Sequence, residues 1–206
     1  MSKRVYLFRL WLRCWHWLNA ALILTLITSG FSLHYSGSNA AVINFGLARQ
    51  IHNYAGLTLC ANYVVFFIGN VITGNWWQFV PSPKEFAKRA WIQTRYYAWD
   101  IFRGLPEPFP PTREVNFNPL QQVTYWAVMY LLMPVLLASG LMFLYPTLAP
   151  ENWFGVDGLL PVALTHYVAG FAIFLFLLSH LYLATMGPKL SSLIMTMITG
   201  WHEEHE

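Results

Sequence analysis

The chain has 206 residues, of which 56% are hydrophobic, 17% are aromatic and only 10% are charged. A soluble domain carries about a quarter charged residues, so this deficit indicates lipid rather than water as the main solvent. The formal net charge of +3 and the dispersed basic residues argue against nucleic acid as a partner. The two cysteines, Cys14 and Cys60, form no Cys-x-x-Cys pair, which excludes covalently attached haem and thiolate-held iron–sulfur or zinc sites.

Four apolar stretches are long enough to cross a bilayer core of about 30 Å at about 1.5 Å per residue. They predict an all-α integral membrane protein, a four-helix bundle that forms a single domain over residues 1–206. The first stretch is too long for the apolar region of a signal peptide and lacks a small-residue cleavage site, so we expect it to be retained. The predicted spans are residues 10–33, 50–72, 122–145 and 162–186.

The segment between the second and third spans, residues 73–121, is predicted to be a cytoplasmic, interfacial connection. It mixes tryptophan and tyrosine with basic residues, as helices in the headgroup layer do, and it includes a Pro-rich crossing at residues 105–112. Residues 190–199 predict a second interfacial helix that ends at a glycine. His202 and His205 follow among glutamates, in what we expect to be a solvated tail.

The lysines and arginines at the edges of the spans are distributed unevenly. Only Arg49 lies in the loops that follow the first and third spans. By the positive-inside rule, both termini and the long connection therefore face the cytoplasm. The eleven residues on that side are Lys3, Arg4, Arg9, Arg13, Lys84, Lys88, Arg89, Arg95, Arg103, Arg113 and Lys189.

Four of the seven histidines lie inside predicted spans, where ionisable side chains are costly and are functional candidates. The expected topology sorts them into two pairs. His16 and His180 share a depth near the cytoplasmic side, and His52 and His166 share a depth near the outer side. Because His166 and His180 are fourteen residues apart, nearly four turns, they project from one helix face about 21 Å apart.

Two imidazoles on one iron give a six-coordinate electron-transfer haem with no open position for a substrate. We therefore predict two b-type haems. The iron on the cytoplasmic side is expected between His16 and His180, and the iron on the periplasmic side between His52 and His166.

Five further residues lie within two turns of these histidines. Arg9, Arg13 and Arg49 can pair with haem propionates, or they can be solvated anchors at the membrane interface. Gly56 and Gly170 leave room for a porphyrin face, although close helix packing explains glycines there equally well.

The sequence around these histidines resembles a known family. Residues 13–20 (RCWHWLNA) and 28–30 (TSG) resemble the first helix of bacterial four-helix di-haem cytochrome b subunits. That family includes the membrane subunits of thiosulfate reductase, nickel–iron hydrogenase and formate dehydrogenase. His52 and the spacing of His166 and His180 are similar to its ligand pattern.

The resemblance implies the same two pairings and a quinone site beside the cytoplasmic haem. It assigns that site to Asn118 with its neighbours Leu120 and Gln121. Asn118 also suits the N-terminal cap of the third span, and the two roles are compatible. The stretches that most resemble the thiosulfate reductase branch are residues 117–125 (FNPLQQVTY), 144–146 (LYP) and 197–203 (MITGWHE).

The resemblance implies an electron-transfer subunit of a respiratory oxidoreductase in the bacterial inner membrane. It would connect menaquinone or ubiquinone with a periplasmic iron–sulfur, molybdenum or multihaem cytochrome subunit. The sequence shows no nucleophile–base pair, phosphate loop or carboxylate dyad, so substrate conversion is expected in the partner.

Two alternatives remain open. One is a haem-free membrane anchor or small transporter that uses the intramembrane histidines, although no span carries the Asp, Glu or Lys that proton relays normally include. The other is a stand-alone transmembrane haem reductase. A visible spectrum that shows haem would exclude the first alternative. Copurification of a partner subunit would distinguish the electron-transfer subunit from the second.

Overall fold

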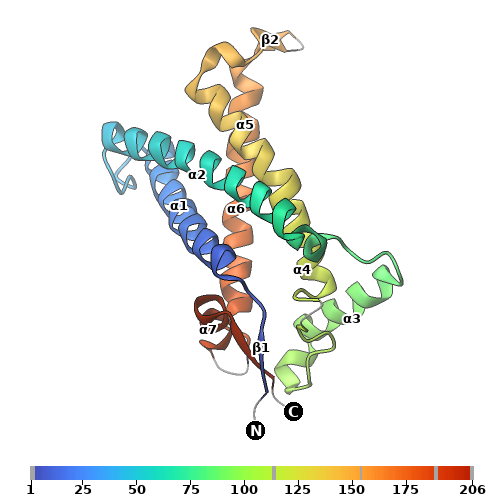
Figure 1. Ribbon diagram of the computed structural model, residues 1–206. Coiled ribbons are helices and arrows are strands. Elements are labelled where there is room, and N and C mark those ends of the chain that lie inside the picture. The colour runs from blue at the N-terminus through green and yellow to red at the C-terminus, as the bar shows by residue number, and fades with distance from the viewer. Residues whose placement is uncertain (1–2, 113–114, 154, 188–189, 205–206) are drawn as a thin grey trace.

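A computed structural model of the chain describes residues 3–112, 115–153, 155–187 and 190–204, and four long helices dominate it (Figure 1). All four are long and apolar enough to cross a membrane. The prediction of an all-α bundle with four apolar spans is therefore confirmed. The four helices are α1 (Leu10–His34), α2 (Phe45–Thr73), the continuous helix Pro119–Leu144 and α6 (Leu159–Ala184).

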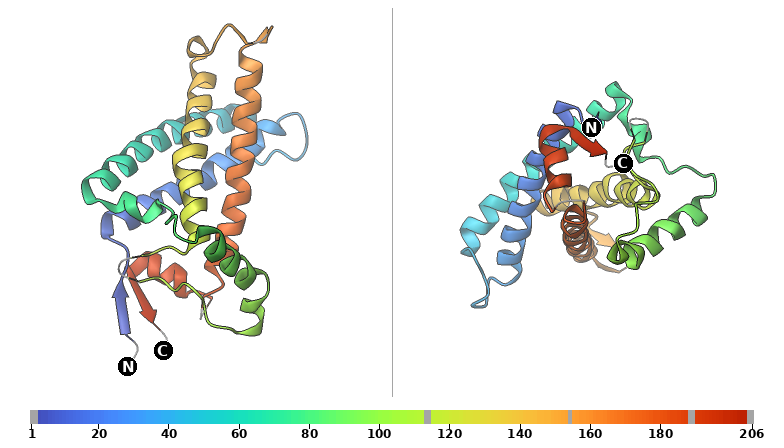
Figure 2. Two further views of the ribbon diagram at one scale, coloured as in Figure 1. Left: turned by 90° about the vertical axis from the view of Figure 1, so that its right-hand side faces the viewer. Right: turned by 90° about the horizontal axis from the view of Figure 1, so that it is seen from below.

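The long helices form two antiparallel hairpins. α1 lies along α2, and the third long helix lies along α6, with the first hairpin steeply inclined to the second (Figures 1 and 2). We call the two ends of the bundle the terminal end and the loop end. The terminal end carries the strands β1 (Lys3–Tyr6) and β4 (Trp201–Glu204) and the helix α7 (Ser192–Thr199). The loop end carries the connections that follow α1 and the third long helix.

The third long helix is not uniform. It consists of α4 (Pro119–Trp126), the π-helical segment η3 (Ala127–Leu132) and α5 (Met133–Leu144). Pro134 explains the irregularity, because proline has no N–H to donate and its ring clashes with the preceding turn. The Met129 carbonyl, in the turn before Pro134, accepts a hydrogen bond of 2.8 Å from the Tyr63 hydroxyl on α2.

Local capping sets the ends of other helices. α2 begins at Phe45, five residues before the predicted span at residue 50, because the Asn44 side chain accepts a 2.9 Å hydrogen bond from the Leu47 N–H. It ends at Gly74, whose φ of 67° is the left-handed conformation that stops helices. Gly200 ends α7 in the same way, with a φ of 85°.

The connection between α2 and α4 contains α3 (Phe86–Ala98), which packs beside α4 at the terminal end (Figure 1). Arg113 and Lys189, which supported the predicted orientation, lie outside the described residues. The remaining short elements are η1 (Asn75–Phe79), η2 (Asp100–Arg103), η4 (Pro146–Leu148), β2 (Asn152–Trp153) and β3 (Val156–Asp157).

Residues 201–204 of the expected tail have regular structure. They form β4, which pairs antiparallel with β1 so that Tyr6 lies opposite Trp201, with ring centroids 5.2 Å apart. This pairing ties the two ends of the sequence together and holds the start of α1 beside α7. His205, the other tail histidine, lies outside the described residues.

Apolar side chains fill the interior between the hairpins and also cover the outer faces of the long helices. Large side chains such as Val64, Ile68, Leu164 and Phe171 are more than half exposed. In a membrane these faces contact lipid, and the backbone polar groups of a helix are satisfied within it. The buried core consists of Leu12, Trp15, Ile23, Leu59, Phe66, Phe79, Val128, Met129, Met133 and Ile173.

Candidate functional site

The two histidine pairs expected from the topology meet in the structure. His16 on α1 and His180 on α6 have ring centroids 6.2 Å apart and ring planes inclined by 53°. His52 on α2 and His166 on α6 also have centroids 6.2 Å apart, with planes inclined by 78°. The first pair lies toward the terminal end and the second toward the loop end, and we name them the terminal-end pair and the loop-end pair.

The spacing within each pair suits a shared metal ion. Two imidazole nitrogens bound on opposite sides of a metal, each at about 2 Å, place their ring centres about 6 Å apart. In the part of the chain that the structure describes, no group of three or more His, Cys, Asp or Glu side chains could hold a metal ion. Each pair therefore offers two ligands, and a bound group such as a porphyrin must supply the others.

A serine contacts each imidazole of the loop-end pair. The Ser29 Oγ lies 3.0 Å from His52 Nδ1, and the Ser139 Oγ lies 3.1 Å from His166 Nδ1. Each hydroxyl donates its one proton to the carbonyl four residues earlier in its own helix, at 2.7 Å in both cases. The oxygen then accepts from the Nδ1–H, so we assign the free lone pair of each ring to Nε2, where a metal can bind.

The two serines belong to one repeated pattern, residues 26–30 (LITSG) and 136–140 (LLASG). A Cβ at Gly30 would lie 3.3 Å from the His52 ring, and a Cβ at Gly140 would lie 3.0 Å from the His166 ring. Glycine therefore lets each helix approach the imidazole closely enough for the serine to reach it. Sequence reasoning missed these contacts, and the repeated pattern is the signal that reveals them.

The terminal-end pair has different neighbours. His16 Nδ1 is buried and has no hydrogen-bond partner among the described residues. The His180 ring stacks on Phe176, with centroids 5.7 Å apart and planes inclined by 27°, and the Tyr125 ring meets it edge-on at 6.2 Å. This pair is therefore held by aromatic packing rather than by hydroxyl groups.

Buried polar atoms without a partner gather at the terminal end. A buried polar group costs about 1–3 kcal/mol when nothing satisfies it, so native proteins rarely leave one unpaired. Among the described residues, seven side-chain atoms are in this state, and none of them belongs to the loop end. They are Trp11 Nε1, Arg13 Nε, His16 Nδ1, both amide atoms of Gln93, Asn116 Oδ1 and Gln122 Oε1.

The three arginines expected near the histidines differ in burial and in hydrogen bonding. Arg13 is half-buried, and its Nη1 donates a hydrogen bond to the Ile198 carbonyl of α7 while its Nε has no partner among the described residues. Arg9, at the start of α1, and Arg49, in the first turns of α2, are exposed. Arg13 therefore offers a buried donor for an anionic group at the terminal end.

The two glycines expected beside the loop-end pair are not required by the packing. A Cβ at Gly56 would meet no atom within 4 Å, and a Cβ at Gly170 would meet only Leu136 Cδ1 at 3.9 Å. The described residues thus leave space at both glycines, one turn after His52 and His166. That space and the two imidazoles fit a haem at the loop end, and at the terminal end the two imidazoles and the unpaired Arg13 Nε fit another.

Asn118 forms the cap of the third long helix. Its Oδ1 accepts from the Gln121 N–H at 3.0 Å, and the Gln121 side chain accepts from the Asn118 N–H at 3.1 Å. The Asn118 Nδ2 donates to the Tyr97 hydroxyl of α3 at 2.7 Å, and Leu120 is half-buried beside it. The capping role is therefore observed, and it leaves one Nδ2 proton for another acceptor.

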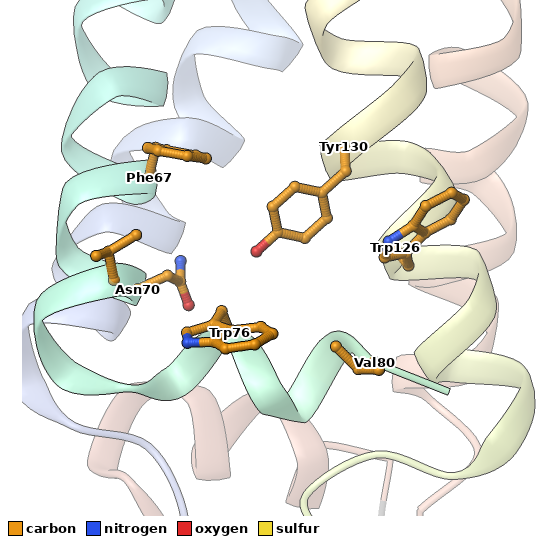
Figure 3. A pocket seen from close by; sticks show the side chains of 7 residues that line it. Phe67, Asn70, Trp76, Val80, Trp126 and Tyr130 are labelled. Carbon is orange, nitrogen blue, oxygen red and sulfur yellow. The ribbon is translucent and has the colours of Figure 1, made fainter. Parts of the chain in front are cut away.

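A separate cavity of about 230 Å³ lies between α2, η1 and the start of the third long helix (Figure 3). Figure 3 shows the Tyr130 side chain directed toward Asn70 across it. The Asn70 amide is already satisfied within the protein, donating to Phe66 O and accepting from Asn75, both at 2.8 Å. The residues that line the cavity are Phe67, Asn70, Val71, Trp76, Val80, Trp126 and Tyr130, and none is an expected site residue.

The family model of prokaryotic cytochrome b561 matches residues 7–200. The chain belongs to this family. The cytochrome YdhU of Escherichia coli (strain K12) is 35% identical over 201 residues, which cover 98% of this chain and 76% of that protein. A Ni/Fe-hydrogenase B-type cytochrome subunit of Rhizobium leguminosarum bv. viciae is 26% identical over 219 residues, covering 96% of this chain and 88% of that subunit.

A Ni/Fe-hydrogenase 1 B-type cytochrome subunit of Escherichia coli (strain K12) is 24% identical and covers 95% of the chain and 89% of that subunit. The resemblance to bacterial cytochrome b subunits is therefore confirmed. As a b561-type cytochrome, this chain is a multi-pass membrane protein that binds b-type haem and takes part in electron transport.

Proposed function

We propose that this cytochrome carries two b-type haems and transfers electrons between the quinone pool and a periplasmic partner in a thiosulfate-reductase-like respiratory complex. The observation that carries the proposal is the pair of equal 6.2 Å imidazole separations, with one histidine of each pair on α6. Four unrelated packing histidines have no reason to adopt one metal-sized spacing twice.

Bound haem supplies a one-electron carrier at each pair. In this proposal His16 and His180 bind one iron, and His52 and His166 bind the other. α6 presents its two histidines about 21 Å apart along one face, so electrons cross much of the bilayer between sites on a single rigid helix. Ser29, on α1, holds one loop-end imidazole in the tautomer that a metal needs.

We place the four long helices across the bacterial inner membrane as one domain, with the terminal end in the cytoplasm. The bias of lysines and arginines toward that end supports this orientation. The quinone would then react near the terminal-end pair, beside Asn118, Leu120 and Gln121. The polar atoms left unpaired at this end support a site for a polar ligand there.

The redox partner would dock at the loop end. There β2 and β3 form a short hairpin with exposed residues, which offers little surface for binding a substrate alone. The names of the hydrogenase cytochrome subunits describe them as parts of a larger enzyme, which supports a catalytic oxidoreductase subunit as partner. We propose that this partner is an iron–sulfur, molybdenum or multihaem cytochrome subunit.

The haem content of the detergent-purified chain tests this proposal. A pyridine haemochrome assay should give about two b-type haems per chain, and a reduced-minus-oxidised spectrum should show bis-histidine ligation. A ratio near one would contradict the two-haem arrangement. Folded protein without haem would favour a membrane anchor or transporter instead.

A further inference from the structure

The walls of the cavity between α2, η1 and the third long helix are fixed by hydrogen bonds. Tyr130 lies in the π-helical segment η3, and the bond from the Tyr63 hydroxyl to the Met129 carbonyl holds that segment against α2. The Gln78 side chain of η1 accepts a 3.0 Å hydrogen bond from the Asn116 N–H, which holds η1 beside the start of α4. Because π-helical turns are rare and occur frequently at functional sites, this cavity is a candidate binding site.

Three hydrogen-bond donors in the lining have no acceptor among the described residues. The Tyr130 hydroxyl points across the cavity and forms no hydrogen bond within the described part of the chain (Figure 3). The indole N–H groups of Trp76 and Trp126 are also without an acceptor there, and the Trp126 nitrogen lies on the side of its ring that faces the cavity (Figure 3). A ligand in the cavity therefore gains most if it carries oxygen acceptors.

The rest of the lining is apolar and opens toward the lipid. Phe67 and Val71 of α2 line the cavity and are more than half exposed on the outer face of that helix. The flat rings of Trp76, Trp126 and Tyr130 surround the space, and such rings pack well against another flat ring (Figure 3). These features suit a flat, largely apolar molecule with carbonyl oxygens that arrives from the membrane, as the ring of a quinone does.

Packed aromatic rings connect the cavity with the helix that carries His16. The Tyr130 ring packs against Phe66, with centroids 6.2 Å apart, and Phe66 packs against Trp15, with centroids 4.5 Å apart. Phe66 is buried, and Trp15 directly precedes His16 on α1. A ring in the cavity would therefore be joined to one ligand of the terminal-end pair by protein alone.

A second series of rings leads from the cavity to His180. The Tyr130 and Phe79 centroids are 6.0 Å apart, and those of Phe79 and Phe117 are 5.5 Å apart. Phe117 meets Tyr125 edge-on at 5.0 Å, and Tyr125 meets His180 edge-on at 6.2 Å. Both imidazoles of the terminal-end pair are thus connected to the cavity, which favours a redox-active occupant over a lipid acyl chain.

We propose that this cavity binds the ring of the quinone as it enters from the lipid, with the Tyr130 hydroxyl and the Trp126 N–H donating to its ring oxygens. This inference rests on the proposed quinone reaction at the terminal end. It adds a binding place eight residues along the third long helix from Asn118, about 12 Å along the helix axis. The cavity holds the ring and takes no part in making or breaking bonds.

Binding of menadione, a naphthoquinone without a tail, to the detergent-purified, haem-loaded protein tests the inference. Quenching of tryptophan fluorescence measures the Kd. Tyr130→Phe keeps the ring that packs against Phe66 and Phe79 but removes the donor, so the Kd should rise by about tenfold. Val71→Phe adds bulk to the lining and should weaken binding at least as much. Tyr54→Phe is the matched control, because the exposed Tyr54 of α2 lies outside the cavity lining.

Stopped-flow reduction of the haems by menadiol gives a second readout. Loss of a contact that holds the ring equally before and during the reaction raises the KM without lowering the kcat. Tyr130→Phe should therefore raise the KM for menadiol by about tenfold and keep the rate at saturation. Dithionite needs no quinone site, so it should reduce this variant as fast as it reduces the wild type.

The outcomes separate the two proposals. If Tyr130→Phe and Val71→Phe both keep the wild-type Kd and KM, or if the wild type binds no menadione, the cavity does not hold the ring. Reduction of the wild type by menadiol would then leave the quinone reaction beside Asn118 standing. If Tyr130→Phe weakens menadione binding but only dithionite reduces the wild type, the cavity site stands and the proposed quinone reaction is contradicted.

Discussion

The loop-end and terminal-end pairs share one imidazole spacing but have opposite surroundings. Both loop-end imidazoles are held at Nδ1 by a serine that is itself satisfied. At the terminal end, His16 Nδ1 has no partner in the described part of the chain. The other unpaired buried side-chain atoms among the described residues also lie at the terminal end, and none lies at the loop end. The difference indicates that the protein completes one site by itself, whereas the other needs polar groups supplied by its ligands.

The largest expected effect on haem binding comes from filling the space beside a loop-end imidazole. A Cβ at Gly140 would already lie 3.0 Å from the His166 ring, so Gly140→Leu should displace the imidazole and remove the loop-end haem. Haem-to-protein ratio should fall by half while the terminal-end haem stays reducible. Gly46→Ala is the control, because its Cβ would make only an ordinary 3.7 Å contact. Two haems in Gly140→Leu would show that this close approach is unimportant.

A smaller effect is expected from removing a serine hydroxyl. Ser139→Ala leaves His166 Nδ1 with only the Leu136 carbonyl at 3.2 Å, so the loop-end haem should bind about tenfold more weakly and shift in midpoint potential. Ser179→Ala is the matched control, since this α6 serine makes the same bond to its own helix but contacts no histidine of the loop end. Redox titration of both variants should show a shift in the first alone.

The smallest effect on the haems should come from the strand pair at the chain ends. Gly200 has a φ of 85°, and a Cβ there would lie 2.7 Å from the Phe8 carbonyl oxygen. Gly200→Ala should therefore lower the free energy of unfolding by at least about 1 kcal/mol, with both haem spectra retained. Gly37→Ala, where a Cβ would meet nothing within 4 Å, should be neutral. Thermal melting followed by haem absorbance measures both.

Much of the histidine arrangement follows from the sequence. Span lengths and helix periodicity fix which end of the bundle each histidine approaches, so His16 could be matched with His180 and His52 with His166 before any coordinates. The cap at Asn118 was also predictable, because Asn before Pro at the start of an apolar run is a strong helix-start signal.

Other features depend on contacts that spacing alone does not reveal. A serine in an apolar helix, such as Ser29, is indistinguishable from a small packing residue until its distance to a histidine is known. The pairing of β1 with β4 joins segments almost 200 residues apart, and neither has a turn signal that points to the other.

Haem content and spectra of single histidine variants test the central claim most directly. His16→Ala and His180→Ala should each lose the same spectral component and retain about one haem per chain, since each iron depends on both imidazoles of its pair. His52→Ala and His166→Ala should lose the other component. If His16→Ala and His52→Ala lost the same component, or if all four variants kept two haems, the pairing would be contradicted.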